Sequence, residues 1–246
     1  MCLLVARSKL PKPDIIVIAD TGREATSTWE YLERHVQPML APLGLRVEIA
    51  PHDLATVDMY GTKGDLLIPA YTNQSGERGK LPTFCSNEWK QRVVMRYLRS
   101  KGVEKCDIWL GFSFDEAERC KPSGTKWFHR VYPLIDGLME PYVPWGIGSG
   151  LAMNRSDCVQ LIRDAGMPEP PKSSCLMCPH RRNDQWRDLR DNYPADFAEA
   201  VAFDEQMRER DPHVFLHESM MPLAIADLGS QSSPQNDQCG LGFCFL

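Results

Sequence analysis

Short apolar runs alternate with helical patterns over the first half of the chain. The β-branched run DIIVIADTG at residues 14–22 stops at a polar turn and predicts a buried strand. Residues 26–40 carry apolar side chains at helical spacing, and LRVEIAPH at residues 45–52 predicts a second strand. A strand, a helix and a strand in this order predict a right-handed crossover and a parallel sheet.

The same pattern resumes after a long interruption. Residues 53–84 are rich in Gly, Thr and Asn and predict an irregular, functional or mobile loop. Residues 86–102 predict a helix that ends at a glycine, and CDIWLGFSF at residues 106–114 predicts a third strand. Residues 121–150, rich in Pro, Gly and aromatic side chains, give no clear pattern.

Beyond residue 150 the pattern is mainly helical. Residues 154–166 predict one helix, and residues 183–210 predict two helices broken near Pro194. The tail from residue 230 is expected to be flexible until its final cysteines. We therefore expect an α/β core with a Rossmann-like parallel sheet over residues 1–150, followed by a smaller, helical, cysteine-bearing region over residues 151–246.

Composition narrows the class of protein. The 246 residues are 43% hydrophobic and 25% charged, as in ordinary globular proteins, and the net charge is −5. A net negative charge does not favour binding to nucleic acid or to an anionic membrane, although it is compatible with a local basic patch. No segment approaches the roughly 18 apolar residues of a membrane span. The N-terminus is not a convincing signal peptide, so we expect the nine cysteines to be reduced in a cytoplasm.

The stretch SSCLMCPHRR contains the most informative cysteines. Cys175 and Cys178 form a C-x2-C pair followed by Pro179, a spacing that lets two thiolates converge on one metal ion. Two ordinary packed cysteines or a redox dithiol are the alternatives, the dithiol being disfavoured because a Pro-rich linker precedes the pair. Candidates for the missing metal ligands are Cys85, His180, Cys239 and Cys244.

The other cysteines are expected to be structural. Cys106 leads an apolar strand and Cys158 lies in an amphipathic helix, and we expect Cys2 and Cys120 to pack in the same way.

Polar residues follow two predicted strands at the sheet edge where ligands bind in open parallel sheets. Asp20, Thr21 and Gly22 end the first strand and favour either a ligand site or a plain capped turn. Glu116 and Arg119 follow the third strand and suit either a ligand site or a solvated helix face. A basic stretch around the C-x2-C pair is a candidate for binding phosphate or sulfate, or a polar helix face; it contains Lys172, His180, Arg181, Arg182, Arg187 and Arg190.

Eight segments in this order resemble one known family. They are IIVIADTGREATSTWEYLERHV, CSNEWK, WLGFSFDEAERCKPS, YPLID, NRSDC, PPKSSCLMCPHRRNDQWRDLR, FLHESMMPLAIADL and CGLGFC. Together they cover nearly the whole chain. They resemble the phosphoadenosine phosphosulfate reductase-like proteins, most closely their phage and prophage branch. That family belongs to the adenine nucleotide α-hydrolase superfamily, which includes the ATP pyrophosphatases.

The resemblance implies an enzyme that binds an adenine nucleotide and performs cysteine chemistry on sulfur. Cys239 would attack the sulfur of adenylyl sulfate or its 3′-phosphorylated form, sulfite would be released, and a thioredoxin-type reductant would regenerate the thiol. A [4Fe–4S] cluster, with zinc as the alternative, would be held by Cys85, Cys175, Cys178 and Cys244, with Cys239 as the alternative fourth ligand. The nucleotide or substrate would contact Asp20, Thr21, Gly22, Arg23, Gly111, Glu116, Arg119, Arg181 and Arg182.

The chain departs from the family pattern at several positions. It opens on a segment that resembles the helix after the family's Ser/Gly-rich phosphate loop, so we expect the first strand and that loop to be missing. Ser86 stands where cluster-bearing members have a second cysteine, and Ser113 replaces an arginine of the third-strand motif. Gly242 replaces the histidine that follows the reductase's C-terminal cysteine motif.

Two other functions fit the same residues. One is ATP-dependent sulfur transfer to a nucleic acid, as in DNA phosphorothioation or tRNA thiolation, with the basic stretch as the polynucleotide contact. The other is a non-catalytic, metal-stabilised module left after loss of the phosphate loop.

Overall fold

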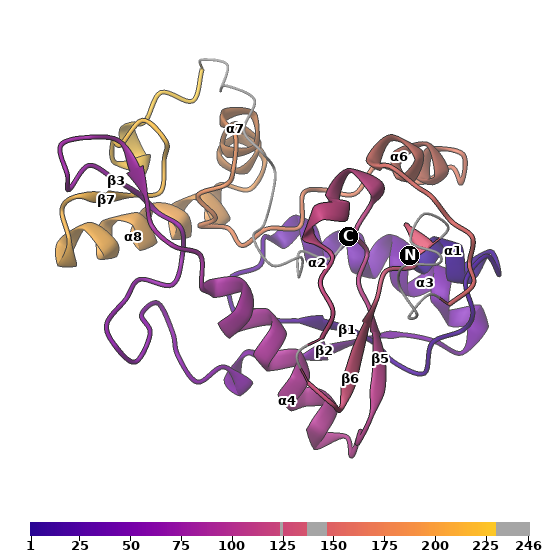
Figure 1. Cartoon of the computed structure of the whole chain (residues 1–246). Helices are drawn as coiled ribbons and strands as arrows, with labels where there is room; N and C mark the ends of the chain where they lie inside the picture. The colour runs from indigo at the N-terminus through magenta and orange to yellow at the C-terminus, as the bar shows by residue number, and fades with distance from the viewer. Residues whose placement is uncertain (124, 137–146, 230–246) are drawn as a thin grey trace.

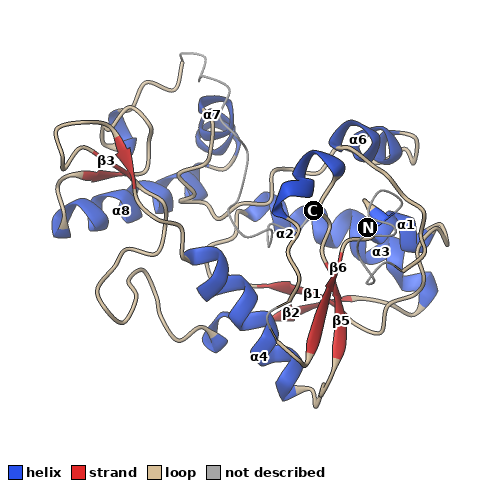
Figure 2. Cartoon of the chain, in the orientation of Figure 1, coloured by secondary structure: helices blue, strands red, loops and turns tan. Residues whose placement is uncertain are grey.

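Two small parallel sheets form the centre of the structure, a computed structural model that describes residues 1–123, 125–136 and 147–229. Strand β1 (Ile16–Ala19) pairs with β2 (Val47–Ala50), and β5 (Cys106–Trp109) pairs with β6 (Phe128–Val131) (Figures 1 and 2). Within the described residues these are separate two-stranded ladders. A mixed α/β fold with small parallel sheets is therefore confirmed.

Helices supply most of the remaining regular structure. The described α-helices are α1 (Cys2–Ala6), α2 (Thr26–Tyr31), α3 (Gln37–Leu40), α4 (Arg92–Ser100), α6 (Arg155–Arg163), α7 (Asn183–Asn192) and α8 (Pro194–Arg210). The π-helices are η1 (Leu32–Val36) and η4 (Ser86–Gln91). The short 3-10 helices are η2 (Ala41–Leu43), η3 (His52–Leu54), η5 (Phe114–Arg119) and η6 (Leu223–Ile225).

Both faces of the β1–β2 ladder are covered by helices. On one face, buried Leu40 of α3 packs in a cluster with Val47 of β2 and with α1. On the other face, Val93 and Val94 of α4 pack with Ala19 at the end of β1. The ladder is nevertheless only partly buried: Ala19, Val47 and Ala50 are buried, whereas Ile49 is 46% exposed.

The predicted elements agree closely with the observed ones where the pattern is long. Residues 26–40 form one continuous helical segment, α2, η1 and α3, and the break near Pro194 separates α7 from α8. An Asn154–Asp157 capping box starts α6. The three predicted strands are present but shorter, and β6 lies in the stretch where no pattern was visible.

A third sheet lies beside the C-terminal helices (Figure 2). Its antiparallel strands β3 (Tyr71–Thr72), β4 (Gly79–Lys80) and β7 (Val214–Phe215) run in the order β4-β3-β7. The two-residue strands β3 and β4 fall inside the loop predicted over residues 53–84, because such short pairings leave no periodic pattern.

The largest hydrophobic cluster joins this third sheet to the C-terminal helices. Its members are Ala25 and residues from 55–89 and 175–228, with Trp89, Trp186 and Met207 fully buried. Asp204 is also fully buried and accepts hydrogen bonds from the backbone N–H groups of Leu216 and Leu223. The packing therefore crosses residue 150, the boundary expected between the two regions.

No helix in the described ranges is long and apolar enough to cross a membrane.

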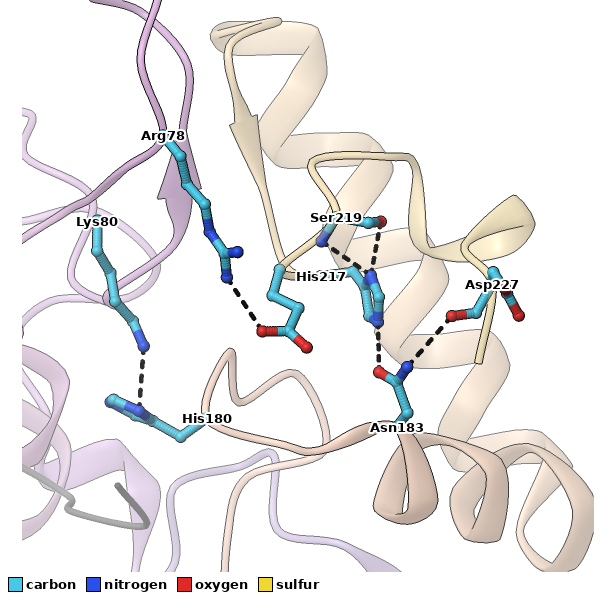
Figure 3. Close-up of polar contacts among 8 residues, drawn as sticks. Arg78, Lys80, His180, Asn183, His217, Ser219 and Asp227 are labelled. Carbon is cyan, nitrogen blue, oxygen red and sulfur yellow. Dashed lines mark hydrogen bonds and ion pairs between the residues drawn. The ribbon is translucent and has the colours of Figure 1, made fainter. Parts of the chain in front are cut away.

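A buried histidine links β7 to the start of α7 (Figure 3). The backbone N–H of Ser219 donates to His217 Nδ1 at 3.2 Å, so this nitrogen is an acceptor. The proton of the neutral ring is then on Nε2, which donates to Asn183 Oδ1 at 2.8 Å. Burial lowers the pKa of His217, and the nearby positive charge of Arg78 opposes protonation further.

We expect His217 to make the free energy of unfolding depend on pH. Its pKa is below the unfolded value of about 6.5, so the unfolded chain binds more protons as the pH falls through that value. Stability contributed by the neutral ring is therefore present above about pH 6.5 and is lost below it. Chemical denaturation at several pH values should show a smaller acid loss in His217→Gln than in the natural chain. An equal acid loss in the two proteins would contradict this role.

Candidate functional site

The carboxyl ends of β1 and β2 lie side by side and carry a tight polar turn. Asp20 Oδ1 accepts a hydrogen bond from the Gly22 N–H at 2.7 Å. Gly22 has a φ of +68°, and a Cβ placed there would lie 2.9 Å from the ring of His52, which follows β2. Glycine is therefore required on two counts, backbone conformation and the close approach of the imidazole.

His52 was not identified in the sequence as a candidate, although it ends the segment LRVEIAPH. The available signal was its position at the carboxyl end of a parallel strand, where ligand sites form. Its Nδ1 is buried and has no hydrogen-bond partner among the described residues. It therefore joins Asp20, Thr21 and Gly22 at this sheet edge.

Three buried side chains and one partly buried cysteine next to this edge form what we call the Glu24 cluster: Thr21, Glu24, Lys90 and Cys175. Thr21 Oγ1 donates to Glu24 Oε1 at 3.1 Å and lies 3.3 Å from Cys175 Sγ. Lys90 Nζ is 3.9 Å from the same Glu24 oxygen, and Cys175 Sγ is 3.8 Å from it. A β-bridge between Glu24 and Cys175 holds the two backbones together. The C-x2-C pair is thus fixed against the end of β1.

The cluster combines two opposite charges with a thiol in a buried setting. The side chains of Lys90 and Glu24 are 9% and 3% exposed. Burial, aided by the negative charge of Glu24, raises the pKa of Cys175 to about 12, while Lys90 and Thr21 oppose this shift. Cys175 is consequently a protonated thiol at neutral pH. A buried ion pair is weak evidence for stability, and Lys90 lies on a π-helix, a feature frequent at functional sites.

Several buried polar atoms around the cluster have no hydrogen-bond partner among the described residues. They are Glu24 Oε2, Ser86 Oγ, Ser174 Oγ and Arg181 Nε. Ser174 precedes Cys175, Ser86 lies one helical turn before Lys90, and Arg181 Nη2 donates to the Ser174 carbonyl at 3.1 Å. Buried orphan groups are uncommon and mark places where water or a ligand completes the hydrogen bonding.

The structure brings only part of the expected nucleotide site together. Asp20, Thr21 and Gly22 lie at the sheet edge, and the Arg23 carbonyl accepts a hydrogen bond from the Leu176 N–H at 2.8 Å. The Arg23 side chain itself pairs with Asp58 and lies over the Trp89 ring.

The other expected contacts have structural partners. Arg181 is buried, and its Nη2 donates to backbone carbonyls of the C-x2-C segment; burial lowers its pKa. Arg182 pairs with Asp184 at the start of α7.

The residues after β5 form a group of their own. Glu116 and Arg119 pair with each other, and the Arg119 guanidinium lies 4.6 Å from the centre of the Phe112 ring. Gly111 is covered by the side chain of Met1, whose Cε would lie 3.3 Å from an added Cβ. These contacts place the three expected residues around the end of β5, whereas the Glu24 cluster lies at the end of β1.

The expected metal ligands are represented only in part. Cys85 and Cys175 pack against the same hydrophobic cluster, and the Cys178 N–H donates to the Cys175 carbonyl at 3.0 Å. The described residues contain no group of three or more His, Cys, Asp or Glu side chains that could hold a metal ion. Cys239 and Cys244 lie outside the described residues.

The cysteines expected to be structural have the environment of packed thiols. Burial raises the pKa of Cys2, Cys106 and Cys158, and it raises that of Cys120 to about 12.

Two pockets lie elsewhere on the described surface. One of 440 Å³ is lined by α8 residues and Phe215, and one of 410 Å³ lies between the segment 5–12 and residues 147–149. Neither is lined by an expected nucleotide or metal residue.

The fold and the site together define a mixed α/β protein whose C-x2-C segment is bonded to the end of a parallel strand. No protein-family model, no curated protein and no solved structure matched the chain. The function must therefore be argued from the site itself.

We expect Gly22→Ala to lower the free energy of unfolding by about 1–3 kcal/mol, because a positive φ is costly for alanine and the new Cβ meets His52. Gly102→Ala is a matched control: its φ is +80° and nothing lies within 4 Å, so it carries the backbone cost alone. Denaturant titration should show the larger loss for Gly22→Ala, with partial recovery in Gly22→Ala/His52→Ala. Equal losses at the two glycines would contradict the close contact.

Lys90→Met should cost about 3–5 kcal/mol, because it leaves the Glu24 carboxylate buried without its cation. Adding Glu24→Gln should restore much of that loss. The control Arg92→Met breaks the surface ion pair between Arg92 and Glu88 on the same helical segment, and it should cost only about 0–1 kcal/mol. Denaturant unfolding of the four proteins measures these differences. A loss for Lys90→Met no larger than that for Arg92→Met would show that the buried pair is not coupled.

Proposed function

We propose that the chain is a sulfonucleotide reductase-like enzyme, with a Rossmann-like core that binds an adenine nucleotide at the carboxyl ends of β1 and β2. The observation that carries this proposal is the junction between that sheet edge and the C-x2-C segment. Thr21 Oγ1 and Cys175 Sγ lie 3.3 Å apart although 154 residues separate them in the chain. Thiol chemistry on a nucleotide requires cysteines and the nucleotide edge in one place.

The described residues have positioning roles in this proposal. Asp20 and Gly22 shape the turn on which the nucleotide would rest, and His52 borders it. The Glu24 cluster holds the cysteine segment against this turn. Cys175 is buried and protonated, so it is unsuited to be the nucleophile.

The proposed reaction is a displacement at sulfur. The Cys239 thiolate forms a bond to the sulfur of adenylyl sulfate or its 3′-phosphorylated form, while the bond from sulfur to the phosphate oxygen breaks and the nucleotide leaves. A thioredoxin-type dithiol then reduces the resulting cysteine thiosulfonate, releasing sulfite and becoming a disulfide. A cysteine-ligated iron–sulfur cluster, or zinc, remains part of the proposal without a step of its own.

ATP-dependent sulfur transfer to a nucleic acid is the second candidate. The observation in its favour is the cationic surface beside the cysteine segment, where Lys80 and Lys172 both contact His180. It requires cleavage of ATP and salt-dependent binding of a polynucleotide.

We expect the full-length chain to release sulfite from adenylyl sulfate or its 3′-phosphorylated form when a dithiol is supplied. Cys239→Ser should lower the rate by at least about a thousandfold while nucleotide binding, measured by calorimetry, persists. Cys158→Ser, which changes a helical cysteine outside the site, is the control and should keep the rate.

The outcomes separate the candidates. Full turnover by Cys239→Ser would refute the nucleophile, and cleavage of ATP without sulfite release would favour sulfur transfer. A folded chain that binds no nucleotide would favour a non-catalytic module. Anaerobic purification with iron, sulfide and zinc assays identifies the metal: a colourless protein with stoichiometric zinc would exclude the iron–sulfur cluster.

A further inference from the structure

Three cationic side chains from two distant segments lie near one another, and two of them contact His180. We call them the basic cluster: Arg78, Lys80 and Lys172. Lys80 Nζ lies 3.2 Å from His180 Nδ1, and Lys172 Nζ donates to the His180 carbonyl at 3.1 Å. Figure 3 shows Arg78 and Lys80 extending from the β4 side toward the segment that carries His180. The ammonium groups of residues 80 and 172 are thus bound to one residue.

The hairpin of β3 and β4 fixes the positions of two of these cations. Tyr71 and Lys80 are opposite each other in the ladder, so their side chains share a face. The Tyr71 ring is 4% exposed and supports both charges, with Lys80 Nζ 4.7 Å and Arg78 Cζ 5.2 Å from its centre. Glu218 accepts from Arg78 Nη2 at 3.0 Å and holds the guanidinium in place. The cations are therefore ordered before any ligand arrives.

The charge of Lys80 is only partly offset where it lies. Within the described residues no carboxylate forms an ion pair with it, and its contacts are the imidazole nitrogen of His180 and the Tyr71 ring. Arg78 and Lys172 act on Lys80 as like charges, and Glu218, which pairs with Arg78, acts on it as an opposite charge. Crowded cations are unusual in a chain of net charge −5, and a bound anion relieves their mutual repulsion.

We propose that the basic cluster binds a tetrahedral oxyanion, the phosphate or sulfate group of a larger molecule, beside Cys178. An arginine fork and two ammonium groups suit such a group, which offers several acceptor oxygens and one or two negative charges. Cys178 lies close enough to interact electrostatically with Lys80, so the anion is held next to the cysteine pair. Assigning that anion to the nucleotide substrate rests on the proposed function; the anion site itself does not.

The test uses the full-length chain with pyrophosphate as the probe, titrated calorimetrically at low salt. Lys80→Gln/Lys172→Gln removes two charges from the cluster. Lys105→Gln/Lys126→Gln removes two exposed charges that precede β5 and β6 and serves as the charge-matched control. We expect at least a tenfold loss of affinity in the first variant and less than a twofold loss in the control. Arg78→Gln, alone, should also weaken binding and covers the case in which the double variant misfolds.

Two further ligands identify the source of the anion. Adenylyl sulfate represents a small nucleotide, and a labelled single-stranded oligonucleotide represents a phosphodiester chain, whose affinity should fall with salt. Binding of adenylyl sulfate or of the oligonucleotide that is weakened in the basic-cluster variants supports the anion site. Absence of binding by all three probes, or equal losses in the cluster and control variants, overturns it. Pyrophosphate binding without sulfite release would support the proposed anion site and contradict the proposed reductase activity.

Discussion

The bridge between Glu24 and Cys175 is the constraint on which the arrangement of this molecule depends. It joins the end of the first parallel strand to a segment 151 residues further along the chain. Around it, Thr21 donates a hydrogen bond to Glu24, and Lys90 and the Cys175 thiol lie within 4 Å of the same carboxylate oxygen. Together with the hydrogen bonds from Thr26 to Asp196 of α8 and from the Leu176 N–H to the Arg23 carbonyl, this junction fixes the cysteine pair relative to the sheet edge.

Charged side chains near this junction divide into two groups. Arg23 is partly buried against the Trp89 ring and pairs with Asp58, and Arg181 is buried and donates to backbone carbonyls, so both hold chain segments together. Arg78 and Lys80 lie on a short hairpin, where Arg78 pairs with Glu218 and Lys80 contacts the His180 ring and the Tyr71 ring. The sequence alone does not distinguish the two groups, because both contain basic residues close to polar turns. Only the contacts show which cations are available to a ligand.

The regular elements could be predicted where apolar spacing persisted for more than about ten residues, as in residues 26–40 and 183–210. The four-residue strands β1, β2 and β5 were also predicted, because they lie inside longer apolar runs, whereas β3, β4 and β6 have no such run and were not predicted. In the site, the turn Asp20–Gly22 was identifiable from its position after a strand. His52, Glu24 and Lys90 were missed, since their importance comes from partners distant in sequence. The contribution of Cys239 and Cys244 stays a prediction, because they lie outside the described residues.

The π-helix that carries Lys90 has a consequence for how this chain can vary. Residues 86–91 follow i→i+5 pairing, so the segment contains more residues per turn than the α-helix that continues from Arg92. Loss of a single residue here would restore ordinary α-helical winding and rotate everything before it by about 100° relative to α4. Cys85 would then turn away from the core while α4 kept its place on the sheet. The segment is thus tolerant of substitution on its outer face but intolerant of any change in length.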